Sequence, residues 1–161
     1  MKRFTVTVAI TALLLTTAVA DHHNEKPWLD MQNCEICKHM SKHMDVMQNV
    51  TWETHKIESG LLSASVVPKE HRQMVDAIHK NMQASAKLFE TGKDMQLCGF
   101  CNSHMALKKS GAKEQEINTD FGMVSLLTSD DPDVVKQIHD HAEKTIKEFA
   151  AFKEAAAGAH Q

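Results

Sequence analysis

Four cysteines, arranged as two Cys-x-x-Cys motifs, are the residues of this sequence best suited to chemistry. Cys34 and Cys37 form the first motif, Cys98 and Cys101 form the second, and the chain has no other cysteine. Residues i and i+3 of a helix share a face, so each motif can direct two sulfur atoms towards one point. Two such pairs can supply the four thiolates of a closed tetrahedral zinc site. The sequence therefore predicts one metal site formed by all four cysteines.

Zinc in a structural role is the first choice of ion, and copper is the alternative. The chain has 10 Met and 11 His but no Tyr, and both enriched residue types can bind copper. Met40, His104 and Met105 follow the two motifs closely and are candidate auxiliary ligands, although methionine more often fills a core. His23 is a further candidate. It would be the third residue of a chain that begins at Asp21, where an amino terminus and an imidazole suit Cu(II).

Disulfide chemistry is the competing interpretation of the two motifs. In an oxidising compartment each motif can close on itself, giving either a thiol-disulfide redox protein or a small binding domain with two local disulfides. A thioredoxin-like enzyme places its motif between a strand and a helix, and neither motif here follows a predicted strand. The sequence also contains no Gly-rich phosphate loop, no His-Glu-x-x-His motif and no nucleophile elbow. A non-enzymatic protein is therefore favoured over an enzyme.

The first 20 residues have the pattern of a secretory signal peptide. Lys2 and Arg3 precede the apolar run 4–15, and the small residues 18–20 form a cleavage site. The run is shorter than the roughly 20 residues that a membrane span needs, and no later stretch comes close. We expect cleavage near Ala20 and export of a soluble chain to the periplasm or the exterior, with a retained N-terminal anchor as the alternative.

The charge of the chain does not favour a polyanionic partner. The net charge is -3 at pH 7, and the basic residues form no cluster. A nucleic acid or an anionic membrane surface would need a basic patch. A metal ion is the one partner that the sequence predicts, and no feature of the sequence indicates a protein partner.

The segment that carries the cysteines occurs twice. Residues 30–32 read Asp-Met-Gln before the first motif, and residues 94–96 repeat these three letters before the second. Further matches continue along the chain: Gly60 with Gly122, Ser63 with Ser125, Pro68 with Pro132, Ile78 with Ile138, His79 with His139, and Phe89 with Phe149. We therefore predict two repeat units, residues 21–91 and 92–161, that share one core. For His79 and His139 we expect hydrogen bonds at the edge of that core rather than a role as ligands.

Each unit is predicted to contain a helix, a β-hairpin and a second helix. Aspartates at positions 30 and 94 are candidate N-caps for the cysteine-bearing helices. Two pairs of segments rich in β-branched residues predict the hairpins: 50–57 with 61–67, and 115–119 with 123–128. The prolines at 68 and 132 mark the start of the closing helices. The predicted fold is α+β, with a four-stranded antiparallel sheet packed by helices on one face and pseudo-twofold symmetry. An all-α four-helix bundle is the alternative.

Overall fold

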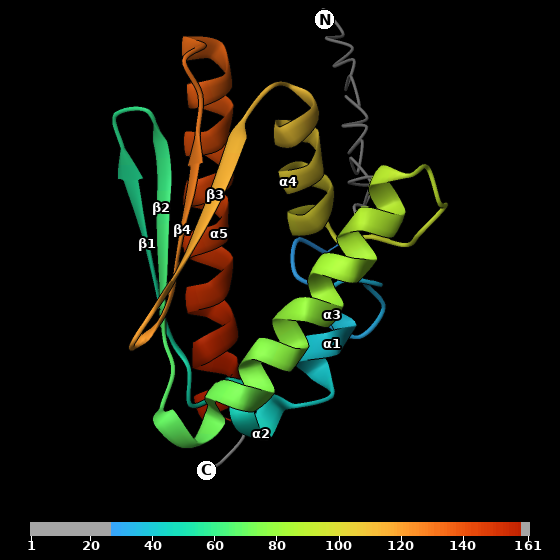
Figure 1. The fold of residues 1–161 in the computed structure, drawn as a ribbon, viewed down its shortest axis with the longest axis vertical. Coiled ribbons are helices and arrows are strands. Elements are labelled where there is room, and N and C mark those ends of the chain that lie inside the picture. The colour runs from blue at the N-terminus through green and yellow to red at the C-terminus, as the bar shows by residue number, and fades with distance from the viewer. Residues whose placement is uncertain (1–26, 159–161) are drawn as a thin grey trace, which may run out of the picture.

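A computed structural model describes residues 27–158 of the chain. The predicted signal peptide and His23 lie outside this range. Figure 1 shows a β-sheet with helices packed beside and behind it. The elements in chain order are α1 (Lys38–Ser41), α2 (Met44–Met47), β1 (Thr51–Ile57), β2 (Gly60–Val66), the short 3-10 helix η1 (Lys69–His71), α3 (Arg72–Glu90), α4 (Gly99–Lys109), β3 (Lys113–Thr119), β4 (Gly122–Thr128) and α5 (Pro132–Gly158).

The four strands form one antiparallel sheet in the order β1-β2-β4-β3. Thr54 lies opposite Ser63, Ser63 lies opposite Ser125, and Glu116 lies opposite Ser125. These four residues, which we call the central row, cross the middle of every strand. The structure confirms the α+β class and the antiparallel sheet and does not favour the all-helical alternative. The four strands also begin and end within two residues of the predicted positions. The prediction succeeds because β-branched residues favour strands and the glycines mark the turns.

Glycine is required where β2 and β4 begin. Gly60 has a φ of +149°, and a Cβ atom there would lie 2.1 Å from the carbonyl oxygen of Leu127. Gly122 has a φ of +153°, and its Cβ atom would lie 2.0 Å from the carbonyl oxygen of Ser65. Each hairpin therefore brings the backbone of one central strand against the backbone of the other.

Replacing Gly60 with alanine is expected to destabilise the protein strongly. The new Cβ atom would overlap the Leu127 carbonyl oxygen and force the two central strands apart, so we expect a loss of about 3 kcal/mol or more in the free energy of unfolding. Gly111→Ala is the matched control, since Gly111 has a φ of +98° but nothing within 4 Å of its Cβ position. The control should lose only the conformational cost of about 1 kcal/mol. Urea unfolding compares the two variants, and equal losses would contradict the close approach.

The helix α5 covers one face of the sheet. It packs against β1, β2 and β4. Leu61 and Leu127 contribute the sheet side of this core, and α5 contributes Val134, Ile138 and Ala142. Ile138 and Ala142 have no exposed surface, which places them at the centre of this contact. The helical period predicts an apolar stripe of Val135, Ile138, Ala142, Ile146 and Phe149. The structure confirms Ile138 and Ala142 but buries Val134 in place of Val135 and leaves Ile146 44 % exposed.

A second group of buried residues lies away from the sheet and contains the cysteines. The helices around it are α1, α3 and α4, with α1 and α2 packed on α3. The cysteine-bearing helices begin later than predicted, at Lys38 and Gly99 rather than near the two aspartates. The Asp30 carboxylate instead accepts hydrogen bonds from the amides of Gln32 and Asn33, which stabilises a turn in place of a helix. None of the helices within residues 27–158 combines the length and the apolarity needed to cross a bilayer.

Candidate metal centre

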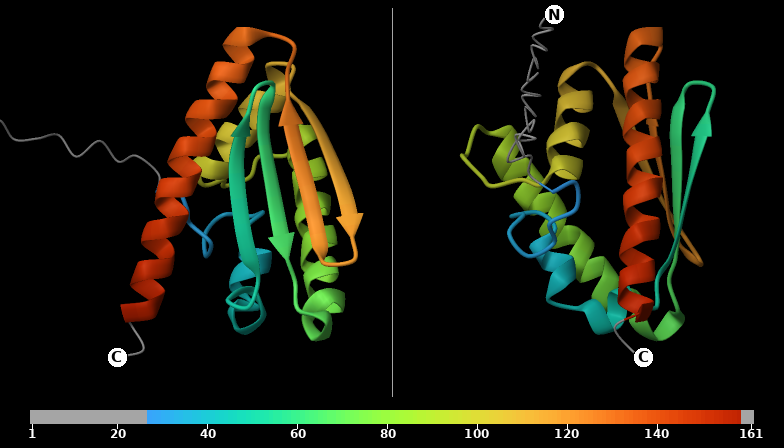
Figure 2. Two further views of the ribbon diagram at one scale, coloured as in Figure 1. Left: turned by 90° about the vertical axis from the view of Figure 1, so that its left-hand side faces the viewer. Right: turned by 180° about the vertical axis from the view of Figure 1, so that it is seen from behind.

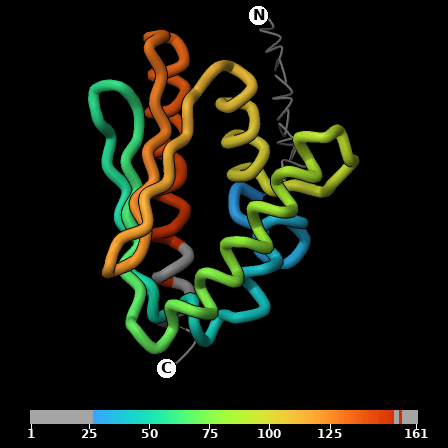
Figure 3. The backbone as a smooth tube through the Cα atoms, in the orientation of Figure 1, coloured from blue at the N-terminus to red at the C-terminus, as the bar shows by residue number. Residues whose placement is uncertain are grey.

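Two short segments that are distant in the sequence bring the cysteines together. The backbone amide of Glu35 donates a hydrogen bond to the carbonyl oxygen of Gln96 at 2.9 Å, which joins the first cysteine segment to the second. Figure 3 shows the segment before α1 beside the start of α4. Cys37 and Cys98 occupy the N-cap positions of α1 and α4, and Cys101 lies in the first turn of α4.

The four sulfur atoms lie close enough to bind one ion. The Sγ atom of Cys37 is 3.3 Å from that of Cys101 and 3.8 Å from that of Cys98, and Cys34 Sγ is 3.6 Å from Cys101 Sγ. All four lie within 4.8 Å of one another. A tetrahedral site with Zn–S bonds of about 2.3 Å has sulfur–sulfur edges of about 3.8 Å. The spacing is therefore compatible with a thiophilic ion such as zinc.

The same distances exclude disulfide bonds in this structure. A disulfide needs a sulfur–sulfur distance of about 2.05 Å. All four cysteines are free thiols, and each is at most 4 % exposed. The four thiols thus form a closed cluster with no sulfur presented to solvent, as in structural rather than catalytic sites.

Hydrogen bonds between the thiols lower the pKa of some of the four cysteines and raise the pKa of others. The neighbouring Cys101 thiol lowers the pKa of Cys34 well below its usual range and lowers the pKa of Cys98 to about 6. The pKa of Cys101 is raised by its hydrogen bond to Cys34. A thiophilic ion binds thiolates and releases their protons. The cysteines with a lowered pKa can therefore bind a metal ion as thiolates while the other thiols still hold their protons.

Apolar side chains surround the cysteines and exclude water from them. Ile36, Leu97 and Met105 are buried in the same cluster. The partly buried side chains packed against it are Met31, Met40, Met82, Ala86, Phe89, Met95 and Phe100. Met40 and Met105, two of the candidate auxiliary ligands, thus adjoin the cysteines. The sequence analysis did not select Met31, Met82 and Met95, although Met31 and Met95 occupy the same place in the repeated Asp-Met-Gln segment.

His104 is directed to a carboxylate rather than to the cysteines. Its Nε2 atom is 3.1 Å from Oε1 of Glu114 on β3, and this hydrogen bond lowers the pKa of the Glu114 carboxyl. Among the described residues, the four cysteines are the one group of His, Cys, Asp and Glu side chains arranged to hold an ion. In the structure, His104 is therefore paired with the Glu114 carboxylate, whereas the sequence made it a candidate auxiliary ligand of the metal ion.

The matching histidines His79 and His139 make the hydrogen bonds expected at the edge of the core. His79 Nε2 lies 3.1 Å from Oε1 of Glu116. His139 Nε2 lies 2.9 Å from the carbonyl oxygen of Ile57 and 3.1 Å from that of Gly60, and it must donate because both partners are acceptors. Both side chains join a helix to the sheet.

His141 is a buried histidine that the sequence analysis missed. It is 4 % exposed, its Nδ1 atom lies 2.9 Å from Ser103 Oγ, and its ring packs near those of Trp28 and Phe100. Burial lowers its pKa to about 4. Its position on the buried stripe of α5, three residues after Ile138, is the signal that could have identified it.

The neutral state of His141 predicts a loss of stability in acid. The folded pKa lies below the usual 6.5, so the unfolded chain binds the proton more tightly. The contribution of His141 is therefore full above pH 6.5 and declines as the pH falls towards 4, by up to about 3 kcal/mol. In His141→Gln, which keeps a polar partner for Ser103, the free energy of unfolding should fall less between these pH values. An unchanged pH dependence in urea titrations would contradict this assignment.

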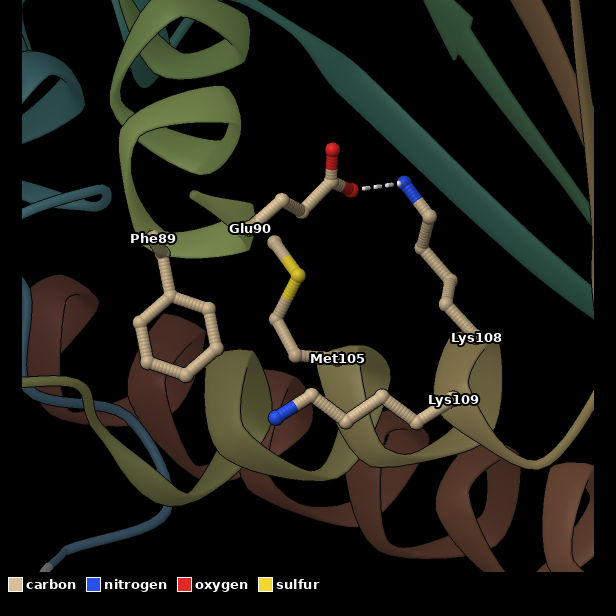
Figure 4. Close-up of a pocket in the computed structure, with 5 residues that line it drawn as sticks. All are labelled: Phe89, Glu90, Met105, Lys108 and Lys109. Atoms are coloured by element: carbon tan, nitrogen blue, oxygen red, sulfur yellow. Dashed lines mark hydrogen bonds and ion pairs between the residues drawn. The ribbon is translucent and has the colours of Figure 1, made fainter. Parts of the chain in front are cut away.

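A surface hollow lies between the end of α3 and α4. Figure 4 shows its lining residues, Phe89, Glu90, Met105, Lys108 and Lys109. Lys108 Nζ lies 2.7 Å from Glu90 Oε1, and Lys109 Nζ lies 5.3 Å from the centre of the Phe89 ring. Met105 borders both this hollow and the cysteine cluster, so it separates the sulfur atoms from solvent at this point.

Comparison of the chain with known protein families, with curated protein sequences and with solved structures finds no match. The function must therefore be inferred from the residues of the site.

Proposed function

We propose that this protein is an exported, soluble, non-catalytic metalloprotein that holds one thiophilic ion with Cys34, Cys37, Cys98 and Cys101. Zinc in a structural role is the preferred ion. One observation carries the proposal: four free sulfur atoms lie within 4.8 Å of one another in a buried cluster. Four thiolates in a closed arrangement are typical of structural zinc sites. Export follows from the signal-like pattern of residues 1–20.

The ion would join two repeat units that are related by a pseudo-twofold axis. Ser63 and Ser125 match in the repeat and lie opposite each other in the sheet. The two hairpins also share a register, since Ile57 pairs with Gly60 in the first and Thr119 pairs with Gly122 in the second. Each unit would supply one Cys-x-x-Cys motif to the shared site. Metal binding would then stabilise the contact between the units.

Copper is the second candidate, because methionines are concentrated around the cysteines. Met105 is part of the cluster, and Met31, Met40, Met82 and Met95 pack against it. Soft thiolate and thioether ligands favour Cu(I). A copper site would serve in scavenging or delivery rather than in folding.

Burial argues against a thiol-disulfide enzyme. Such an enzyme needs one nucleophilic sulfur that a substrate can reach. Here the most exposed cysteine, Cys101, has only 4 % of its surface accessible.

Native mass spectrometry tests the proposal on protein purified without reductant or chelator. We expect one zinc ion on a chain with four reduced cysteines. A single copper ion would support the second candidate. A metal-free chain that is four hydrogens lighter, because two disulfides have formed, would contradict both.

A further inference from the structure

The face of the sheet opposite the helices is apolar and uncovered. Side chains alternate along a strand, so residues next to the buried Leu61 and Leu127 point to the other face. In the described part of the chain no helix lies over this face, as the left view of Figure 2 shows. The residues that form its apolar centre, here called the open face, are Leu62, Ala64 and Val66 of β2, Val124 and Leu126 of β4, and Ile117 of β3.

The open face carries apolar side chains where a solvated sheet face normally carries polar ones. Val66 is 46 % exposed and Ile117 is 42 % exposed, while the other four residues of the open face are half-buried. An antiparallel sheet with one solvated face normally carries polar side chains there. A contiguous apolar patch rimmed by polar residues is typical of a protein interaction site.

We propose that the open face binds the open face of a second copy of this chain. The twofold axis of the dimer would run across the strands, along the central row that contains Ser63 and Ser125. This inference is independent of the metal ion. It depends on which side chains of the two open faces the rotation brings together, first in charge and then in shape.

Charge is the first of these relations. Glu53 and His55 lie on β1, on either side of Thr54 in the central row, and both point to the open face. Rotation about the row places Glu53 opposite the partner's His55, and His55 opposite the partner's Glu53. The two side chains already form a hydrogen bond within one chain, with His55 Nε2 3.4 Å from Glu53 Oε2. Two copies would thus present two carboxylates and two imidazoles in alternation.

Shape is the second relation. The same rotation places Leu62 opposite the partner's Ala64, and Val66 opposite the partner's Gly60. On β2 each large side chain therefore meets a smaller residue, which allows these two strands to approach closely. On β4 Leu126 meets the partner's Val124, and these two apolar side chains form the centre of the contact.

The size of the open face predicts a weak, reversible dimer. Four strands of seven residues cover about 450 Å² when strands are about 4.8 Å apart and each residue rises about 3.4 Å. Two such faces bury about 900 Å², which is less than the roughly 1,200 Å² of stable interfaces and in the range of transient ones. Interfaces of about 1,600 Å² can bind only in the micromolar range, so we expect a dissociation constant that is micromolar or weaker.

Sedimentation velocity over about a hundredfold range of protein concentration around this constant tests the proposal. The wild-type protein should shift from monomer to dimer. Val66→Lys should raise the dissociation constant at least about a hundredfold, because each of the two copies would bury one introduced lysine in the interface. Leu88→Lys is the matched control, since Leu88 is also 46 % exposed but lies on α3. The control should dimerise like the wild type.

Charge exchange tests the direction of the axis. Glu53→Lys should weaken the dimer because it places a lysine opposite the partner's His55. The double variant Glu53→Lys with His55→Glu should restore the dimer. Both positions are exposed, so circular dichroism should show that the variants fold. A wild-type protein that stays monomeric at every concentration overturns the proposal, as does a dimer that Val66→Lys leaves intact.

Discussion

Replacing Cys34 with serine is expected to weaken metal binding at all four positions and not only at the first motif. A four-thiolate zinc site contributes about 10–16 kcal/mol, so the loss of one ligand removes about 3 kcal/mol and lowers the affinity about a hundredfold. The Cys101 sulfur lies 3.6 Å from the Cys34 sulfur, so an ion bound by the first motif would also be in reach of the second. Competition with a chromophoric zinc chelator measures the change.

Met40→Leu is the control for this experiment. Met40 packs against the cysteine cluster, and leucine has a similar volume but no sulfur. A zinc site should keep its affinity in this variant. If Cys34→Ser leaves one full-affinity site at Cys98 and Cys101, the two motifs bind independently and the shared site is wrong.

Metal removal is expected to cause the largest loss of stability. The cysteine cluster belongs to a group of buried residues that packs apart from the core under α5, so the ion would stabilise a region that the sheet does not support. An ion at about 1,000 times its dissociation constant stabilises the folded state by about 4 kcal/mol. For a chain of this size we expect a rise of about 15 °C in Tm when zinc is added to the metal-free protein.

The double variant Cys34→Ser with Cys98→Ser gives the control for thermal unfolding. It removes one ligand from each motif and should show no change of Tm with zinc. Scanning calorimetry with and without zinc compares it with the wild type. A wild-type Tm that does not respond to zinc would contradict a structural role for the ion.

The fold could be predicted from local patterns to a large extent. The β-branched segments and the glycines at 60 and 122 gave both hairpins, and Pro132 gave the start of α5. The starts of the cysteine-bearing helices could not be predicted in the same way. Asp30 is a good N-cap in isolation, but its carboxylate also stabilises a non-helical turn, and the contact between Glu35 and Gln96 is visible only in three dimensions.

The site could be predicted as a set of sulfur ligands, but not with its surroundings. The recurrence of the Cys-x-x-Cys motif identified the four cysteines that the structure brings together. The sequence made His104 a candidate auxiliary ligand because it closely follows the second motif, whereas the pairing of β3 with β4 presents Glu114 to it. The burial of His141 depends on the packing of α5 against Trp28 and Phe100, two residues distant in the sequence. Such long-range contacts have no local signal.

X-ray absorption spectroscopy at the zinc edge tests the central claim most directly, on protein purified with its ion. Four thiolates from the two motifs predict a first shell of four sulfur atoms at about 2.3 Å, with no nitrogen or oxygen. A first shell that contains nitrogen or oxygen at about 2.0–2.1 Å would mean that histidine, carboxylate or water replaces a cysteine. That result would contradict a site built from Cys34, Cys37, Cys98 and Cys101 alone.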